Sequence, residues 1–488
     1  MFPFEHVILI EKESKTAVYR QIAISIINAI RGGTIKSNTH LPGTRKLAVS
    51  LGVHRKTVIA AYEELEAEGW VVIIPRKYAI VTENIPSFKP QKWNQNKVLA
   101  PYENNLTISF KIVNKKMITE SSISVPDIMI NDGHPDVRLS PIDDLLKTYR
   151  SLTSRKHGIK NANIGTTQGT LSLREEMVDY ISETRGINIS SDNLLITHGA
   201  QMSIYLAAQL LLEPLSHVIV GKPNYPLANK TFEETGAKII EVAVDDEGID
   251  TDAIELICKK EKINAVYVIP HHHYPTTVTL SVERRMKLLE LSKEFSFAII
   301  EDDYDYDYHY TSSPYLPLAS ANHNGNVVYI GSFSKILDPS LRMGFMIAPK
   351  NFITQCTALR KIIDVGGDGY MQNALAALIK GGELKRHLKK AKKSYHQRRD
   401  LLDKLLKEQL GDYVYYTLPT GGMAIWVKLK PAFPISQLIS NTKLQIIRID
   451  KEQNAFRFGF ASLDETELEQ TVEFLKMEFQ KITSTIST

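Results

Sequence analysis

The sequence predicts two folded units of different classes: a small helical unit that ends in a β-hairpin, and a larger α/β domain with a mostly parallel sheet. A chain of 488 residues corresponds to about three units of roughly 150 residues. Helical periodicity dominates residues 12–82. From residue 126 to 482, short apolar runs alternate with amphipathic stretches, which is typical of an α/β domain. Residues 83–125 lie between these units.

The composition is that of an ordinary globular protein. Hydrophobic residues make up 43% and charged residues 23% of the chain, which argues against disordered, collagen-like and coiled-coil proteins. The two cysteines, Cys258 and Cys356, are too few for a disulfide framework and fit no metal-ligand spacing. No apolar run reaches the roughly 18 residues of a membrane helix, and residues 1–6 do not resemble a secretory signal. We therefore expect a cytoplasmic protein without a membrane partner.

The small unit begins with an amphipathic helix in KTAVYRQIAISIINAIRGG. One face of this helix carries Val18, Ile22, Ile26, Ile27 and Ile30. A short helix in GTRKLAVSLGV is followed by Gly52, where a left-handed residue ends the helix and turns the chain. A third helix begins at His54, and its predicted buried side chains are Val58, Ala61, Tyr62 and Leu65.

The first turn of the third helix carries polar and cationic side chains: His54, Arg55, Lys56 and Thr57. Two helices joined by a tight turn, with such a leading turn on the second, are typical of a recognition helix that enters a DNA major groove. After Gly69, WVVII and YAIV flank residues 75–77, which predicts a hairpin with a basic tip. The alternative interpretation is a small packing module whose exposed cations are merely solvated.

The segment LPGTRKLAVSLGVHRKTVIAAYEELEAEGW closely resembles the winged helix-turn-helix of GntR-type regulators, with the approximate pattern LPSxRxLAxxLGVSRxTVxxAYxxLxxEG. The resemblance implies a double-stranded DNA operator as partner. The residues that it implies as DNA contacts are Arg45, His54, Arg55, Lys56, Thr57, Arg76 and Lys77. Two positions depart from the pattern: His54 replaces the usual Ser or Thr N-cap, and Pro-Arg-Lys replaces a glycine-rich hairpin tip. Both departures affect the operator sequence rather than binding itself.

Residues 83–125 carry scattered Pro, Asn, Lys and Ser without a sustained period, which predicts a linker. An excess of lysine over glutamate keeps this segment solvated. Two interpretations stay open: a plain tether, and a tether that also touches a polyanion.

The segment SFSKILDPSLRMGF places Lys335 just after a predicted strand. A lysine amine that is partly deprotonated in a pocket of low dielectric constant forms a Schiff base with a carbonyl compound. Ser332, Ser334 and Arg342 suit the oxygens of a phosphate group. Taken alone, a lysine at the end of a strand is more often a solvated residue.

Asp302 and Tyr304 lie at the end of the predicted strand in AIIEDDYDYDY. A carboxylate keeps a pyridinium nitrogen protonated, and a nearby tyrosine can hydrogen-bond a ring oxygen. The alternatives are an acidic aromatic loop and a divalent-metal site. Further ligands for a metal are not evident in the sequence, so we predict none.

Two further segments suit a phosphorylated ring. In LLITHGAQMSIYLAAQLL, a strand, a small-residue turn and a helix direct the amides of Gly199, Ala200 and Gln201 toward an anion. In KPNYP, Tyr225 follows a strand, where its ring can stack on a cofactor.

Together with GTTQGTLSLRE and FRFGFASL, these segments resemble the fold-type I, class I/II aminotransferases over nearly all of residues 126–480. The resemblance implies a large subdomain with a mostly parallel sheet, a smaller C-terminal α+β subdomain, and pyridoxal 5′-phosphate as cofactor. The implied catalytic residues are Lys335 as the aldimine lysine, Asp302 as the partner of the pyridine nitrogen, and Tyr304 as the donor to the ring oxygen. Tyr225 is implied to stack on the ring, and the implied phosphate contacts are Ala200, Gln201, Ser332, Ser334 and Arg342. Arg457 is implied to bind the α-carboxylate of an amino acid, and a structural salt bridge is its alternative.

The segment PHHHYPTTVTLS departs from the aminotransferase pattern. Aminotransferases commonly have Asn before Pro-Thr-Gly, and that Asn contacts the ring oxygen. Here Tyr274 stands before Pro275, and Thr277 replaces the glycine. Without the Asn contact, the electronic state of the cofactor ring is not set by the usual residue, and the sequence does not decide whether the protein turns over substrate. The three consecutive histidines are more typical of a site loop than of a metal site, with His272 expected near the cofactor.

A GntR-type winged helix, a linker and an aminotransferase-like domain in one chain resemble the MocR group of bacterial regulators from end to end. The resemblance implies a homodimer that senses an amino compound or pyridoxal phosphate itself through aldimine exchange at Lys335. Sensing would change the spacing of two winged helices on DNA. The alternatives are a working aminotransferase with an appended DNA-binding domain, and a structural dimer domain without cofactor. The missing Asn favours the sensor.

Overall fold

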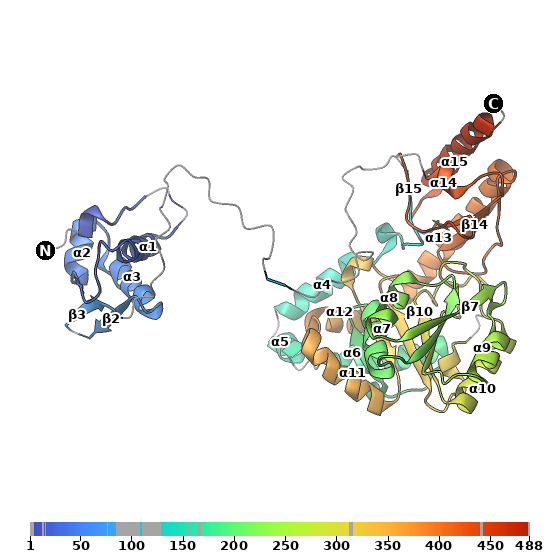
Figure 1. The fold of residues 1–488 in the computed structure, drawn as a ribbon, viewed down its shortest axis with the longest axis horizontal. Coiled ribbons are helices and arrows are strands. Elements are labelled where there is room, and N and C mark those ends of the chain that lie inside the picture. The colour runs from blue at the N-terminus through green and yellow to red at the C-terminus, as the bar shows by residue number, and fades with distance from the viewer. Residues whose placement is uncertain are drawn as a thin grey trace. The chain divides into compact units, whose positions relative to one another are not determined.

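In a computed structural model, the chain forms two compact units, residues 1–120 and residues 121–488. Figure 1 shows the first unit in blue and the second in cyan to red. The structure describes residues 4–11, 14, 16–75, 77–83, 108–109, 128–154, 156–163, 167–311, 316–439 and 443–486. The linker predicted at 83–125 lies almost wholly outside the described residues, and so does Arg76.

In its described residues, the small unit contains three α-helices and a three-stranded antiparallel sheet (Figure 1). Its helices are η1 (Phe4–His6, a 3-10 turn), α1 (Val18–Arg31), α2 (Thr44–Leu51) and α3 (Arg55–Ala67). Its strands are β1 (His40–Leu41), β2 (Val71–Ile74) and β3 (Tyr78–Val81), in the order β1-β3-β2. The predicted hairpin is therefore β2–β3. The sequence did not predict β1, because two residues are too few to carry a periodic pattern.

Most of the predicted core of the small unit is buried, whereas Val18 and Ile27 of α1 are partly buried at its edge. The buried side chains are Ile22, Ile26 and Ile30 of α1, and Val58, Ala61, Tyr62 and Leu65 of α3. They form one cluster with Trp70 and Val81 of the sheet region. Gly52 ends α2 with φ of 65°, the left-handed conformation that glycine adopts without strain, as predicted.

An eight-stranded sheet forms the centre of the larger unit. In spatial order its strands are β5 (Leu194–Thr197), β12 (Gly344–Ile347), β11 (Val327–Ser332), β10 (Ala298–Asp303), β9 (Ala265–Val268), β6 (His217–Lys222), β7 (Lys238–Asp245) and β8 (Gly248–Ile249). Strands β11, β10, β9, β6 and β7 pair in parallel. Strand β12 is antiparallel to both of its neighbours, and β8 is antiparallel to β7. Because parallel strands end at one edge, the residues that follow β10 and β11 meet there.

Helices cover both faces of this sheet (Figure 1). They are α4 (Ile142–Thr153), α5 (Lys156–Asn163), α6 (Leu171–Arg185), α7 (Ala200–Leu211), α8 (Pro226–Glu234), α9 (Thr251–Cys258), α10 (Val282–Phe295), α11 (Lys350–Ile363) and α12 (Gly369–Lys380). The 3-10 turns are η3 (Val137–Leu139), η4 (Ser191–Asn193), η5 (Leu318–Ser320) and η6 (Pro339–Leu341).

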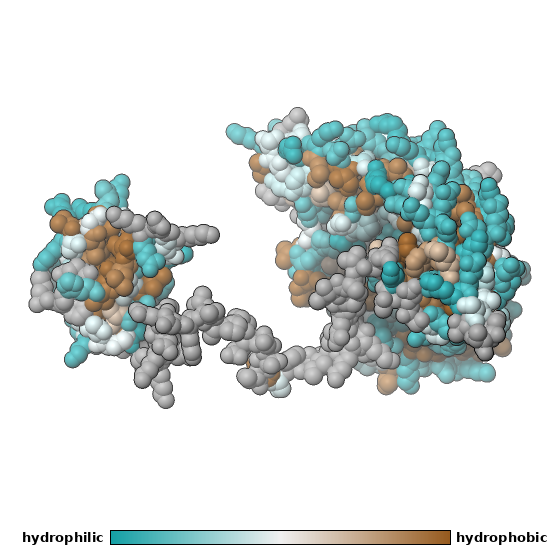
Figure 2. Space-filling view, turned by 90° about the horizontal axis from the view of Figure 1, so that it is seen from above, coloured by the Kyte–Doolittle hydropathy of each residue, from teal (hydrophilic) through white to brown (hydrophobic). Residues whose placement is uncertain are grey.

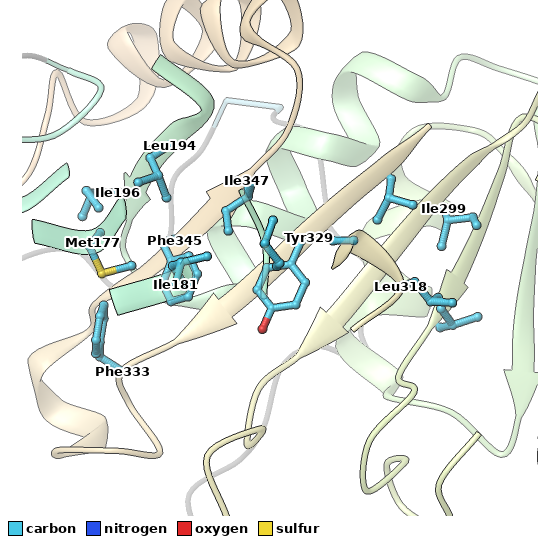
Figure 3. Packing of buried hydrophobic residues seen from close by; sticks show 14 of the residues in the cluster. Met177, Ile181, Leu194, Ile196, Ile299, Leu318, Tyr329, Phe333, Phe345 and Ile347 are labelled. Atoms are coloured by element: carbon cyan, nitrogen blue, oxygen red, sulfur yellow. The ribbon is translucent and has the colours of Figure 1, made fainter. Parts of the chain in front are cut away.

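Strand alternation assigns successive side chains to two hydrophobic layers. In β11, Tyr329 packs with the layer of α6, α9, α10 and α12, whereas Ile330 packs with the layer of α7, α8 and α11. Figure 3 shows the first layer, where Tyr329 and Phe345 of the sheet lie among side chains such as Ile181 of α6. With both faces covered, the strands are apolar on both sides, which explains their continuous hydrophobic runs.

The C-terminal part forms a smaller α+β subdomain. Its antiparallel sheet has the order β13 (Val414–Tyr415), β14 (Ala424–Leu429), β17 (Ala455–Gly459) and β16 (Ile449–Asp450). Its helices are α13 (Glu383–Leu410), α14 (Ile435–Leu438) and α15 (Glu465–Ile486). A two-stranded parallel pair joins β4 (Ile128–Ile130) to β15 (Leu444–Ile446). The chain then passes β17, where the Gly459 amide donates to the Asn131 carbonyl, and continues toward Lys335.

The predicted fold class is confirmed: a winged helix-turn-helix unit precedes an α/β domain with a mostly parallel sheet and a smaller α+β subdomain. Hydrophilic side chains cover much of the face of the larger unit that Figure 2 shows, with hydrophobic ones in patches between them. Among the described helices, none combines the length and apolar character needed to cross a lipid bilayer.

Candidate functional site

The small unit presents its predicted DNA contacts on the surface. Arg45 of α2 is exposed, and so are His54, Arg55 and Lys56 at the start of α3. Thr57 is half-buried behind them. His54, Arg55, Lys56 and Thr57 therefore lie on the leading turn that the sequence predicts for a recognition helix, and Arg45 lies on the preceding helix.

His54 caps α3 with its ring. The backbone amide of Lys56 donates a hydrogen bond to His54 Nδ1 at 3.2 Å. The usual hydroxyl cap is missing, as the sequence predicts, and the imidazole nitrogen takes its place. Arg55 Nε donates to Thr44 Oγ1 at 3.3 Å, which ties the first turn of α3 to the start of α2. Lys77 is exposed at the hairpin tip.

A cavity of about 270 Å³ in the larger unit gathers every residue predicted to bind a cofactor. These residues are Ala200, Gln201, Tyr225, Asp302, Tyr304, Ser332, Ser334, Lys335 and Arg342. The lining also includes Asp132, His134, Ile269, Tyr274 and Pro339. Segments far apart in the sequence thus meet where β10 and β11 end and α7 begins.

Lys335 follows β11 and reaches into the cavity. Its Nζ donates a hydrogen bond to the Gly133 carbonyl oxygen at 2.7 Å. Burial lowers the pKa of Lys335, and the charge of Asp132 only partly opposes this shift. A lower pKa increases the fraction of neutral amine, which is the nucleophilic form.

Asp302 lies at the end of β10 and is only 3% exposed. Its Oδ2 accepts a hydrogen bond from the Tyr267 hydroxyl at 2.7 Å, whereas Oδ1 is buried without a partner among the described residues. Burial raises the pKa of Asp302 to about 7 despite the Tyr267 hydrogen bond. An unpartnered carboxylate oxygen suits a protonated ring nitrogen, because that positive charge favours the ionised carboxylate.

The neighbouring acids point away from the cavity, because side chains alternate along a strand. Asp303 accepts a hydrogen bond from the Tyr329 hydroxyl at 3.0 Å. Glu301 accepts from two backbone amides at the start of η5, at 2.7 and 2.9 Å. The acidic run is thus divided between the cavity and the core. Within the described part of the chain, no group of three or more His, Cys, Asp or Glu side chains is placed to hold a metal ion.

One end of the cavity is suited to an anion. The first residues of α7, Ala200 and Gln201, line it, and amides in the first turn of a helix have no partner within that helix. Arg342 lies beside this terminus, where a Cβ on residue 199 would be only 2.8 Å from Arg342 Nη2. Gly199 therefore leaves room for the guanidinium. A helix N-terminus and an arginine side by side attract a phosphate group.

The serines after β11 complete this end. Ser332 Oγ accepts a hydrogen bond from the Ser334 amide at 3.1 Å. Ser334 Oγ and Gln201 Oε1 are buried, and neither has a partner in the described ranges. A hydroxyl without an acceptor in this position is a donor for a phosphate oxygen. The residues present therefore fit a ligand with a phosphate at one end and a protonated ring nitrogen near Asp302.

Two predicted aromatic residues line the cavity in different ways. Tyr225 meets Tyr274 edge-on, with ring centroids 5.5 Å apart, and burial raises the pKa of Tyr225 to about 12. The Tyr304 hydroxyl donates to the His272 carbonyl oxygen at 2.9 Å and accepts from Arg457 Nη2 at 2.9 Å. The predicted donation from Tyr304 to a ring oxygen stays a prediction.

Arg457 lies behind the cavity and is only 1% exposed. Its Nε donates to the Asp132 carbonyl oxygen at 2.7 Å, and its Nη1 donates to the Pro275 carbonyl oxygen at 2.9 Å. The Tyr274 ring lies over the guanidinium, with 5.0 Å between Cζ and the ring centroid. Each guanidinium nitrogen thus already donates to the protein. The predicted binding of a carboxylate by Arg457 stays a prediction.

The three consecutive histidines turn toward different partners. The pairs are His271 with Asp303 at 3.0 Å, His272 with Asp305 at 3.0 Å, and His273 with Thr276 at 2.9 Å. All three are buried, and His272 packs against Gly421 and Gly422 of the smaller subdomain. His272 does not line the cavity; it contributes the carbonyl oxygen that Tyr304 contacts.

Three residues that shape the site were not predicted: Asp132, His134 and Tyr267. Asp132 Oδ2 accepts from the Tyr274 hydroxyl at 2.9 Å, and Asp132 Oδ1 lies 3.2 Å from His134 Nε2. Asp132 and His134 are about two hundred residues from Lys335, and no spacing rule joins such distant segments. The sequence pattern that could have indicated them is Asp132 and His134 on either side of Gly133, just after strand β4. For Tyr267, the only indication in the sequence is that its hydroxyl group stands in the otherwise apolar strand β9.

A larger and more open hollow of about 720 Å³ lies among α4, α12 and α13. Charged side chains in its lining pair with one another, as Arg386 does with Glu383 at 2.6 Å and Lys147 with Asp144 at 3.4 Å. The cavity around Lys335 instead contains buried polar atoms that lack partners in the described structure. We therefore assign the candidate site to the smaller cavity.

Comparison with known proteins identifies both units. The aminotransferase class I and II family matches residues 133–475, and the gntR family of bacterial regulatory proteins matches residues 18–81. Among solved structures, Pyrococcus horikoshii kynurenine aminotransferase, crystallised with PMP, is similar with a TM-score of 0.68 and 26% identity. That similarity covers 76% of this chain and 97% of the aminotransferase.

Relatives match over nearly their full length. The uncharacterized HTH-type transcriptional regulator YdfD of Bacillus subtilis is 26% identical over 486 residues, covering 97% of this chain and 98% of YdfD. The HTH-type transcriptional regulator TauR of Rhodobacter capsulatus is 27% identical over 459 residues, covering 90% and 91%. The chain belongs to the aminotransferase class I and II family, and its N-terminal unit is a helix-turn-helix domain of the gntR family of bacterial regulatory proteins.

Proposed function

We propose that this protein is a DNA-binding transcriptional regulator of the MocR type that senses an amino compound or pyridoxal phosphate itself. In this proposal residues 12–82 bind an operator, residues 83–125 are a linker, and residues 126–482 bind the cofactor. The carrying observation is the cavity around Lys335, where Asp302 Oδ1 and Ser334 Oγ are buried without partners among the described residues. The names of the full-length relatives, both HTH-type transcriptional regulators, support the regulatory role.

Pyridoxal 5′-phosphate is the cofactor that these residues suit. Its phosphate would be held by Ala200, Gln201, Ser332, Ser334 and Arg342. Asp302 would bind the ring nitrogen, Tyr225 would contact the ring face, Tyr304 would donate to the ring oxygen, and Lys335 would approach the aldehyde. When bound, the cofactor supplies a carbonyl carbon that reacts with primary amines. The solved neighbour crystallised with PMP supports this assignment.

Lys335 is the residue through which a ligand amine would be detected. The hydrogen bond to the Gly133 carbonyl orients its amine, and the lowered pKa keeps part of it neutral. If a ligand amine took the place of the Lys335 amine, the freed Lys335 amine would lie beside the Gly133 carbonyl and the Asp132 carboxylate, which favour its protonated form. Such a change of charge, at the segment that passes from β17 to the cavity, would be a local event able to bias a larger rearrangement.

DNA would be bound by the exposed first turn of α3 together with Arg45 and the basic hairpin tip, Arg76 and Lys77. We propose a homodimer, because two half-sites require two recognition helices. Exposed apolar side chains in the last turn of α11 and just after it, Ile362 at 84% and Val365 at 69%, support a surface for a second copy. Since bacterial DNA lies in the cytoplasm, we place the protein there.

Full-length protein tests the proposal in two linked measurements. Addition of pyridoxal phosphate should produce a visible absorption band, and a duplex selected from a random-sequence pool should bind with strong salt dependence. A panel of amino compounds should then shift the absorption band and change the affinity for that duplex in the same order of potency. Absence of a visible band, or DNA affinity that no amine or cofactor alters, would contradict the sensor.

A working aminotransferase is the second candidate, because Lys335, Asp302, Tyr304 and Arg342 all line one cavity. The aromatic-amino-acid aminotransferase of Thermococcus litoralis, 30% identical over 307 residues, supports this candidate. Repeated consumption of an amino acid that stops when the keto acid is withheld would favour it. A stable spectral shift that a keto acid does not reverse would favour the sensor.

A further inference from the structure

The charge around Lys335 indicates which amines the proposed sensor binds, so this inference rests on the proposed function. Among the cavity residues, Arg342 lies at the phosphate end and Asp302 at the ring position. Asp132 and His134 remain beside Lys335 at the end where a ligand amine would react.

Asp132 carries a negative charge into this end of the cavity. Its side chain is 18% exposed and accepts hydrogen bonds from Tyr274 at 2.9 Å and from His134 at 3.2 Å. Burial raises the pKa of Asp132, but the His134 hydrogen bond and the charges of Lys335 and Arg457 outweigh it and hold the pKa well below its usual value. The carboxylate is therefore ionised under ordinary conditions.

Apart from Arg342, the arginines next to this end of the cavity are Arg457 and Arg448, and both pack against Tyr274. Its ring centroid lies 5.0 Å from Arg457 Cζ and 5.6 Å from Arg448 Cζ, so the ring contacts both guanidinium groups. Neither arginine lines the cavity, and the nitrogens of Arg457 already donate to backbone carbonyls and to Tyr304. Arg342 lines the opposite end, where the phosphate would lie, so a carboxylate beside Lys335 meets Asp132 and the Tyr274 ring first.

We propose that the cavity selects a primary amine that carries a second positive charge, such as a diamine, and that Asp132 binds the second charge. A carboxylate accepts short, strong hydrogen bonds from an ammonium group, whereas a second carboxylate beside it is repelled. Asp132 is thus the specificity-determining residue of the site, and the alternative ligand is an amino acid whose carboxylate reaches Arg457.

Three ligands with the same four-carbon chain and the same reacting amine separate these alternatives. Putrescine carries a distal ammonium, butylamine a distal methyl group, and γ-aminobutyrate a distal carboxylate. Each is titrated into full-length protein loaded with pyridoxal phosphate, and the visible absorption band is followed. We expect putrescine to bind about tenfold or more tightly than butylamine, and γ-aminobutyrate to bind most weakly.

Two variants locate the effect. Asp132→Asn retains an acceptor for the Tyr274 hydroxyl but removes the charge, so the preference for putrescine over butylamine should shrink by about tenfold. Asp412→Asn makes the same chemical change at an exposed position and should leave the preference unchanged. If Asp132→Asn retains the full preference, Asp132 is not the determinant.

The outcomes distinguish this inference from the proposed function. γ-Aminobutyrate or an α-amino acid binding more tightly than putrescine would overturn the diamine inference and favour the Arg457 contact, while the sensor stays intact. Equal affinity of the three ligands would also overturn it. Loss of the visible band in unmodified protein would instead overturn the cofactor proposal. The ligand series on unmodified protein decides the question even if the Asp132 variant does not fold.

Discussion

The two candidate sites of this chain hold their charges in opposite ways. At the start of α3, the Arg55 and Lys56 side chains are exposed to solvent. Around Lys335 the ionisable groups are buried or half-buried, and burial lowers the pKa of Lys335 and raises that of Asp302. The first site presents its charges to solvent, whereas the second holds its ionisable groups in contacts inside the protein.

This difference follows from what each partner offers. A DNA duplex presents phosphates and base edges along a surface, so exposed cations on a helix are sufficient and their energy depends on salt. A small ligand presents few groups, so its site must place donors, acceptors and shifted pKa values in advance. Substitutions should therefore act differently in the two sites.

The largest expected effect is at Lys335. Replacing Lys335→Ala should abolish the visible absorption band formed with pyridoxal phosphate, because no other lysine lines the cavity within the described structure. The thermal midpoint without ligand should change little. Lys393→Ala on the exposed face of α13 is the matched control and should keep the band. A band that survives in Lys335→Ala would show that the site is elsewhere.

The next effect is a pH dependence of stability without ligand. The pKa of Asp302 is about 7 in the folded protein and about 4 in the unfolded chain. Asp302 therefore binds its proton more tightly in the folded state. The contribution of Asp302 to stability therefore falls as pH rises from about 4 to about 7. Denaturant unfolding should show that the free energy of unfolding falls between pH 5 and pH 8. The fall should be larger in the unmodified protein than in Asp302→Asn, by on the order of 1–4 kcal/mol. Parallel curves would contradict the raised pKa.

At the DNA surface the expected effects are smaller and leave the fold unchanged. Arg55→Ala should weaken binding by about 1–3 kcal/mol if Arg55 reads a base edge, with relaxed preference at one position of the selected duplex. A phosphate contact would instead lower the salt slope by about one and affect all sequences equally. Fluorescence anisotropy at several salt concentrations separates these results, and no change at any salt would remove Arg55 from the interface.

The smallest expected effect concerns the cap of α3. Because a serine hydroxyl is a preferred N-cap, His54→Ser should stabilise the first turn of α3 by about 0.5–1 kcal/mol relative to the imidazole cap. Amide hydrogen exchange in the absence of DNA should then slow about two- to fivefold in that turn. Faster exchange would mean that His54 contributes more than its hydrogen bond to Lys56.

Much of the cavity was predictable because its residues lie at strand ends or helix starts that the sequence marks. Asp302, Ser332 and Lys335 follow apolar runs, and Gly199 precedes an apolar helix, so topology alone brings them to one edge of a parallel sheet. Asp132, by contrast, reaches Lys335 only because β4 pairs with β15 and the chain then passes β17. Such long-range pairing leaves no periodic signal in either segment.

The sequence by itself determined the two units, the mostly parallel sheet, and those cavity residues that follow its strands or begin its helices. These features depend on local periodicity and on strand order, which are both encoded along the chain. Only the tertiary structure decided which charged side chains can contact a ligand in the cavity. It covered Arg457 with Tyr274, turned the acids beside Asp302 into the core, and placed Asp132 beside Lys335. The reason is physical: whether a charged group meets a ligand or a neighbouring carbonyl depends on packing between distant segments, and local pattern carries no record of it.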